Sequence, residues 1–143
     1  MNKAKLFLIF VIGFLYVITP IKAGAGDYLG DYCWNFSNQT FGGSGTLKLG
    51  VVHLGGGHYL CSGLITVTDP IFMQFPAYGN AEVVGGEIYM TLSLAGIRND
   101  VMGIDMMKAR LNPINLSGPF EYIGVYVDDV EHSVGTVTYT ACQ

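Results

Sequence analysis

Residues 81–94 read Ala-Glu-Val-Val-Gly-Gly-Glu-Ile-Tyr-Met-Thr-Leu-Ser-Leu, and this stretch predicts a β-hairpin. Apolar and polar residues alternate on both sides of the Gly-Gly pair, as they do in strands with one buried face. Two consecutive glycines supply the positive φ angles that a two-residue type I′ turn requires. Such a turn pairs Val83 with Ile88 and Ala81 with Met90, and it points the side chains of Ile88 and Met90 toward the core.

The same period-two pattern recurs along the chain, between clusters of Gly, Asn, Asp and Pro that are typical of turns. It predicts an all-β domain, an eight-stranded antiparallel up-and-down β-barrel in which consecutive strands are neighbours and the sheet closes on itself. Two of the strands, 101–112 and 119–127, alternate less regularly, so a β-bulge is expected in one of them. The expected strands are 31–38, 45–54, 58–68, 79–84, 87–95, 101–112, 119–127 and 134–142.

The first 25 residues have the pattern of a secretory signal peptide. Lys3 and Lys5 precede the apolar run 6–18, and the small residues 23–25 follow. Cleavage is expected after residue 25, or alternatively after residue 23. The apolar run is shorter than the roughly 20 residues that a membrane-spanning helix needs. We therefore expect residues 26–143 to form a single domain that is secreted or periplasmic.

Charge excludes several classes of partner. Removal of the signal peptide leaves 118 residues with four basic side chains and all 11 acidic ones, a formal charge of −7. Proteins that bind nucleic acids or anionic lipid surfaces concentrate Lys and Arg, so neither partner is expected. Insertion into a membrane as a β-barrel is also not expected, because the alternation places apolar residues inside rather than outside.

The three cysteines can be sorted by the faces of their strands. Cys33 lies on the polar face of the first strand and Cys142 on the Thr-rich face of the last. These strands are neighbours if the barrel closes, with Cα atoms about 4.5 Å apart in a non-hydrogen-bonded pair, which is within disulfide range. We therefore predict a Cys33–Cys142 disulfide and a buried Cys61 thiol. A Cys33–Cys61 bond and three reduced cysteines are the alternatives.

One connection between strands is unusually apolar. Residues 69–78 are bounded by two prolines, yet they include Ile71, Phe72, Phe75 and Tyr78. Connecting segments are normally polar, so this one is expected to fold over an opening of the barrel. It acts either as a lid over a hollow lumen or as a plug that seals a filled core, because eight-stranded barrels allow both.

The leading functional hypothesis is that the barrel binds a small hydrophobic molecule in its lumen or at its mouth, without catalysis or a cofactor. The inward-facing aromatic residues and the apolar connection support it. The expected binding residues are the wall and lid residues Trp34, Tyr59, Phe72, Phe75 and Tyr139, with His53 as the single polar group.

Other chemistry has little support in the sequence. His53 and His58 flank three glycines, but a three-residue loop turns them to opposite faces, so no metal site is expected. An enzyme that shapes its substrate in a cavity, as barrel-shaped cyclases and isomerases do, would need Asp105, Glu121 or His53 to converge there. A protein-interaction or inhibitor module would instead have a filled barrel, with Phe72, Phe75 and Tyr78 exposed to solvent.

An exported eight-stranded meander with Trp34 in its first strand resembles the calycin group, which includes the lipocalins and the avidin-like barrels. Those families have Gly-x-Trp at this place, whereas here Gly30 lies four residues before Trp34. The segments 45–50 and 117–121 look like turn-and-strand pieces of small exported bacterial lipocalin-like proteins. The resemblance implies a carrier of hydrophobic ligands.

The signal-peptide hypothesis predicts the N-terminus of the exported protein. N-terminal sequencing and intact mass measurement should find a chain that begins at Gly26, because the small residues at 23–25 suit signal peptidase. A chain that begins at Gly24 would support the alternative cleavage. An exported chain that retains Met1 would contradict the hypothesis.

Overall fold

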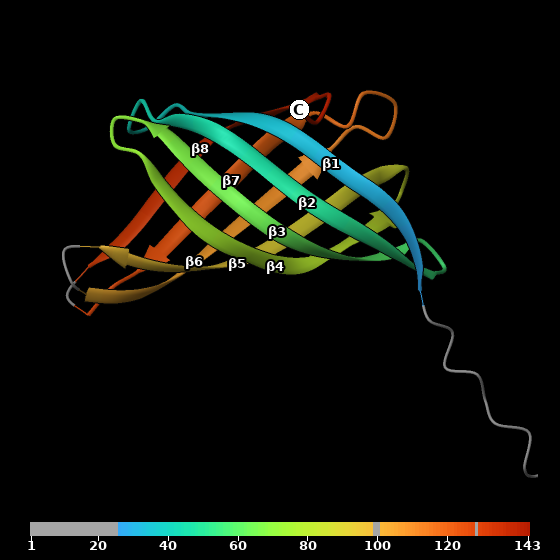
Figure 1. Ribbon diagram of the computed structural model, residues 1–143, viewed down its shortest axis with the longest axis horizontal. Coiled ribbons are helices and arrows are strands. Elements are labelled where there is room, and N and C mark those ends of the chain that lie inside the picture. Colours follow the sequence, from blue (N-terminus) through green and yellow to red (C-terminus); the bar gives the residue numbers. More distant parts are fainter. Residues whose placement is uncertain (1–25, 99–100, 128) are drawn as a thin grey trace, which may run out of the picture.

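The computed structural model describes residues 26–98, 101–127 and 129–143, and the expected signal peptide lies outside these residues. Figure 1 shows eight strands wound around a single axis. They form a closed barrel in which each strand pairs with the next one in the sequence and β8 pairs with β1. The strands are β1 (Asp27–Asn38), β2 (Ser44–Gly55), β3 (His58–Asp69), β4 (Met73–Val84), β5 (Glu87–Arg98), β6 (Val101–Leu111), β7 (Gly118–Val125) and β8 (Val130–Thr140).

This architecture confirms the expected all-β, eight-stranded antiparallel barrel, and it is consistent with a calycin-like fold. The hairpin of β4 and β5 has the predicted register, with Val83 opposite Ile88 and Ala81 opposite Met90. Both of its turn glycines have positive φ angles, 61° at Gly85 and 83° at Gly86. The described residues contain no helix that could cross a membrane.

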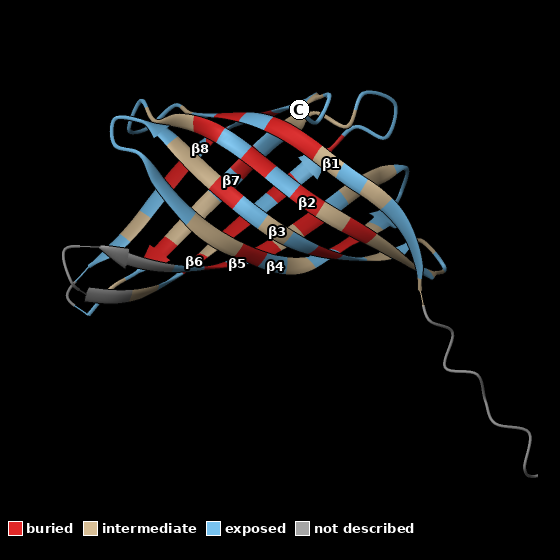
Figure 2. Ribbon diagram, in the orientation of Figure 1, coloured by how far each residue is buried: buried red, intermediate tan, exposed pale blue. Residues whose placement is uncertain are grey.

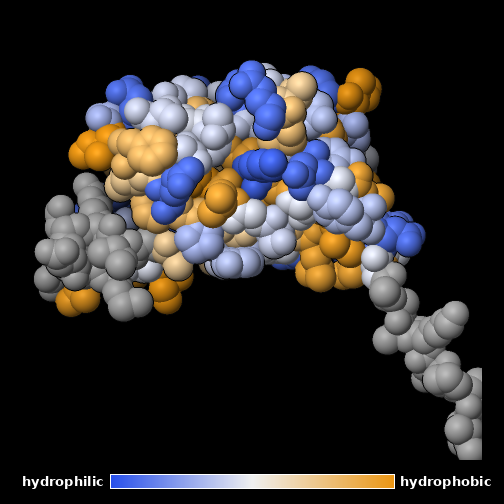
Figure 3. All heavy atoms as spheres, in the orientation of Figure 1, coloured by the Kyte–Doolittle hydropathy of each residue, from blue (hydrophilic) through white to orange (hydrophobic). Residues whose placement is uncertain are grey.

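Alternation along the strands builds the core. Figure 2 shows buried and exposed residues following one another along β1, β2 and β3. On the outer surface, hydrophilic residues lie across the middle of the face in Figure 3, and its larger hydrophobic patches lie toward the two ends. The largest fully buried side chains fill the middle of the barrel, and they are Leu47, Leu49, Leu92, Met107, Val137 and Ser133.

The seam between β1 and β8 carries the disulfide. Pairing between these strands runs from Cys33 opposite Thr140 to Asn38 opposite Gly135. Cys142 follows two residues after Thr140 and is bonded to Cys33, with 5.2 Å between the Cα atoms. Cys61 is a free and buried thiol. The structure therefore confirms both the predicted pairing and the predicted unpaired cysteine.

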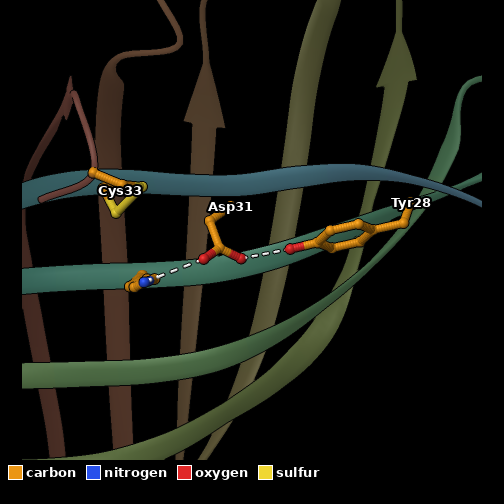
Figure 4. The surroundings of a disulfide bond; sticks show 5 residues. Tyr28, Asp31 and Cys33 are labelled. Atoms are coloured by element: carbon orange, nitrogen blue, oxygen red, sulfur yellow. Dashed lines mark hydrogen bonds and ion pairs between the residues drawn. A yellow bond between two sulfur atoms is a disulfide. The ribbon is translucent and has the colours of Figure 1, made fainter.

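A polar row lies beside the disulfide on the outer face of β1 and β2 (Figure 4). The Tyr28 hydroxyl donates a hydrogen bond of 2.6 Å to Asp31 Oδ1, and Lys48 Nζ lies 3.1 Å from Asp31 Oδ2. These contacts lower the pKa of Asp31, with the Tyr28 hydrogen bond as the largest cause. Asp31 therefore stays ionised next to the seam.

The apolar segment 69–78 is neither a lid nor a plug, and this prediction was wrong. Most of it belongs to β4, and only residues 70–72 connect β3 to β4. Pro76 is the reason that this segment was predicted to be a connection, because proline is rare inside a sheet. It is tolerated here because Pro76 pairs with Leu64 on one side, whereas the pairing of β4 with β5 begins only at Ala77.

Irregularities in pairing lie elsewhere than predicted. Strands β6 and β7 pair without a register shift from Ile104–Val125 to Ala109–Phe120. The shifts lie instead in β1, between Tyr28 and Gly30, and at both ends of β2. Gly30 has a φ of 118°, a conformation that glycine adopts without strain. The extra residue in β1 is Leu29, and the side-chain alternation shifts there.

The disulfide should contribute strongly to stability, because it links residues 109 positions apart and so restricts most of the unfolded chain. We expect the double variant Cys33→Ser/Cys142→Ser to lose about 2–4 kcal/mol of unfolding free energy in urea titrations. Cys61→Ala, which removes a thiol but no cross-link, is the control and should lose less. Equal losses in the two variants would contradict the prediction.

Candidate functional site

An apolar pocket of about 180 Å³ opens at the end of the barrel where β1 begins and β8 ends. Alternate residues of several strands form its wall, and Leu116 of the connection between β6 and β7 also lines it. Its lining consists of Leu29, Tyr32, Trp34, Val51, Tyr59, Cys61, Ala81, Ile88, Met90, Leu111 and Leu116.

The pocket exists because small side chains lie next to large ones on the inner face at this end of the barrel. Ala81 of β4 lies between Tyr59 of β3 and Met90 of β5 in the sheet. Cys61, two residues beyond Tyr59, is also small and is only 5% exposed. Larger residues at these positions would fill the space, as Leu47 and Leu92 do in the middle of the barrel.

The connection between β6 and β7 folds over the pocket and is held by Trp34. The Trp34 indole Nε1 donates a hydrogen bond of 2.7 Å to the carbonyl oxygen of Leu116. Leu116 has a φ of 53°, which is unusual for a residue other than glycine, and its side chain lines the pocket. The Ser117 Oγ accepts a hydrogen bond of 2.9 Å from the backbone N–H of Tyr139. These bonds attach the connection to both strands of the seam.

Three aromatic rings form one side of the mouth. The Tyr32 and Trp34 ring centroids are 6.2 Å apart, and Tyr139 lies 6.0 Å from Trp34 in an edge-on arrangement. Trp34 is 3% exposed, whereas Tyr139 is 41% exposed. The cluster therefore extends from the buried wall to the solvent.

The structure brings together only some of the residues predicted to bind a ligand. Trp34 and Tyr59 line the pocket, and Tyr139 contacts Trp34 at its mouth. The His53 ring packs 5.1 Å from the Tyr59 ring, between centroids, beside the lining. Phe72 and Phe75 lie near the opposite end of the barrel, where Phe72 is 68% exposed and Phe75 is half-buried against the core.

The predicted binding residues include only two of the eleven residues of the lining, Trp34 and Tyr59. Among the nine others, Leu29 and Leu116 lie outside the expected strands. Leu29 reaches the pocket because the register shift in β1 changes the face on which it lies. The alternation of apolar and polar residues does not indicate this shift. The available signal was Gly30, because glycine inside a strand often marks a bulge. Leu116 is an apolar residue within a connection rich in Asn, and that contrast was the available signal.

The candidate acidic and metal-binding pairs do not form. Asp105 is buried in the barrel, whereas Glu121 is exposed and lies opposite Lys108 in the sheet. His58 is exposed, with its Nδ1 3.9 Å from Glu82 Oε2, and His53 lies on the other face. No group of three or more His, Cys, Asp or Glu side chains that could hold a metal ion occurs among the described residues.

Cys61 carries the most nucleophilic side chain in the lining, but the apolar surroundings disfavour ionisation of its thiol. Burial raises the pKa of the Cys61 thiol to about 11. The thiolate is the reactive form, so near neutral pH Cys61 behaves as a small apolar wall residue.

Comparison of the chain with protein families, with curated proteins and with solved structures found no match.

Thiol labelling should report on this wall. In the native protein at pH 8, Ellman's reagent is expected to find no reactive thiol, because Cys61 is buried and protonated and the other cysteines are bonded. Unfolding in guanidinium should release one thiol for each chain, and reduction of the unfolded chain should release three. Rapid labelling of the native protein would contradict this description of the pocket.

Proposed function

We propose that the protein is an exported, non-catalytic barrel that binds a small hydrophobic molecule in the apolar pocket at its mouth. The observation that carries the proposal is the composition of the pocket. Its lining of aliphatic and aromatic side chains includes no carboxylate, imidazole, ammonium or guanidinium group among the described residues. Such a lining favours apolar ligands through the hydrophobic effect and offers little for acid–base catalysis.

The volume limits the size of the ligand. An engineered protein cavity of about 150 Å³ with apolar walls binds benzene, whereas pockets for drug-sized molecules start at about 300 Å³. A pocket of about 180 Å³ therefore suits a single aromatic ring or a short branched hydrocarbon group. A longer ligand would place only one end inside, with the rest along Tyr139 and His53.

Export and a likeness to lipocalins are part of the same proposal. The disulfide supports an oxidising compartment such as the periplasm or the cell exterior. The closed meander supports a calycin-like carrier, because eight-stranded barrels such as the lipocalins are wide enough to hold one small ligand.

An interaction module is the second candidate function. It is favoured by exposed apolar side chains outside the pocket, including the aromatic residues Phe72 and Tyr78, which are 68% and 59% exposed. Phe75, which this hypothesis also required at the surface, is half-buried. A partner protein bound there would contact residues that do not line the pocket.

Binding can be tested with p-xylene, which matches the volume and polarity of the pocket. Trp34 is the only tryptophan in the chain and lines the pocket, so its emission should change saturably as p-xylene is added. Ala81→Leu should weaken binding by about tenfold or more, since the larger side chain occupies the space.

Ala95→Leu is the matched control, because it adds the same volume at an exposed position of β5. Its affinity for p-xylene should equal that of the unaltered protein. The absence of a saturable response in the unaltered protein would contradict the proposal. An equal affinity of Ala81→Leu would place the binding outside this pocket.

A further inference from the structure

Two tyrosines of the pocket wall point into the barrel. Tyr32 of β1 lies opposite Leu49 in the sheet, and Tyr59 of β3 lies opposite Ala81. Residues opposite one another in an antiparallel pair have their side chains on the same face, and Leu49 and Ala81 belong to the core. Both tyrosine rings pack against that core and line the pocket. Each ring therefore brings a hydroxyl group to the inner face of the wall.

The hydroxyl groups of these two tyrosines have no hydrogen-bond partner among the described residues. An outward-facing tyrosine shows the difference, because the Tyr89 hydroxyl donates a hydrogen bond of 2.9 Å to Glu87 Oε2. A hydroxyl group that lines a pocket and has no protein partner is available to a ligand. Tyr32 and Tyr59 thus offer directional polar contacts in a pocket that is otherwise apolar.

The other polar side chains of the lining are bonded already or donate weakly. Trp34 Nε1 donates its hydrogen bond to the Leu116 carbonyl oxygen, and the Cys61 thiol is a weak donor. The described residues of the lining include no positively charged side chain, so the cost of burying a carboxylate there would not be offset. The same residues include no carboxylate that could hold a cation. The pocket therefore favours an uncharged ligand that accepts a hydrogen bond.

We propose that the ligand is an uncharged aromatic carbonyl compound, such as an aryl ketone, whose oxygen atom accepts hydrogen bonds from Tyr32 and Tyr59. This inference rests on the proposed function, because it concerns the ligand of the same pocket. Only β2 separates β1 from β3, so the strands that carry the two tyrosines are about 10 Å apart, within the combined reach of their side chains. A carbonyl oxygen has two lone pairs and can accept both bonds. The ring of the ligand occupies the space beside Ala81.

The test uses three ligands with the same number of heavy atoms: acetophenone, the hydrocarbon α-methylstyrene and the anion benzoate. Dissociation constants are measured from the amide signal of Ala81 in heteronuclear NMR titrations of the unaltered protein. Water solvates the ketone better than the hydrocarbon, so a pocket without hydrogen bonds would bind α-methylstyrene more tightly. We expect acetophenone to bind at least as tightly as α-methylstyrene and about tenfold or more tightly than benzoate. Tighter binding of α-methylstyrene or of benzoate would overturn the proposal.

The double variant Tyr32→Phe/Tyr59→Phe keeps both rings and removes both hydroxyl groups. It should bind acetophenone about tenfold more weakly, because two hydrogen bonds are lost, and it should keep its affinity for α-methylstyrene. Tyr89→Phe is the matched control, because it removes a hydroxyl group from the outer face and should leave both affinities unchanged. An unchanged ratio of the two affinities in the double variant would contradict the role of the hydroxyl groups. The comparison of the three ligands needs no variant, so it decides the question even if the double variant does not fold.

Failure of this inference and failure of the proposed function give different results. If neither p-xylene nor α-methylstyrene binds in the pocket, the proposed function itself is wrong. If both hydrocarbons bind, but more tightly than acetophenone, the pocket is a hydrocarbon site and only the carbonyl inference fails.

Discussion

Closure of the sheet between β1 and β8 is the constraint on which the rest of the structure depends. With this seam in place, the alternate residues of every strand enclose one interior. Without it, Trp34 and Phe36 of β1 and Val137 of β8 would face water on an open sheet. The Cys33–Cys142 bond lies directly beyond the last residue pair of the seam. The covalent link thus reinforces the strand pair on which the core depends.

The enclosed interior is divided into two chemically different ends. Leu47, Leu92 and Met107 are almost completely buried and fill the middle. One end is apolar and aromatic, and small residues of β3 and β4 leave it partly hollow. The other end contains a carboxyl group and two phenols around Gly124. The barrel is therefore neither entirely hollow nor entirely filled, since it has a filled middle and an open pocket at one end.

Alternation along the sequence was sufficient to predict the number and order of the strands, the hairpin register and the disulfide, because these depend on which face a residue occupies. It did not give the ends of every strand, since β1, β4 and β8 all begin earlier than expected. It failed where local backbone geometry changes that face. The extra residue at Leu29 and the strand that continues through Pro76 are the two clearest examples. The site was predicted less well than the fold: Trp34 and Tyr59 were found, but Leu116 belongs to a connection whose path depends on a hydrogen bond from Trp34. No periodic pattern encodes such a contact.

The irregular start of β1 also affects how this protein behaves at high concentration. Among the described residues, the part of β1 before Cys33 pairs with β2 but not with β8, so one of its backbone edges is open. An open edge is a template on which strands of other molecules can assemble into aggregates. The bulge at Leu29–Gly30 interrupts that template, and the acids Asp27 and Asp31 would repel a second acidic chain. The deviation that carries Leu29 to the pocket thus also protects the barrel from association through its edge.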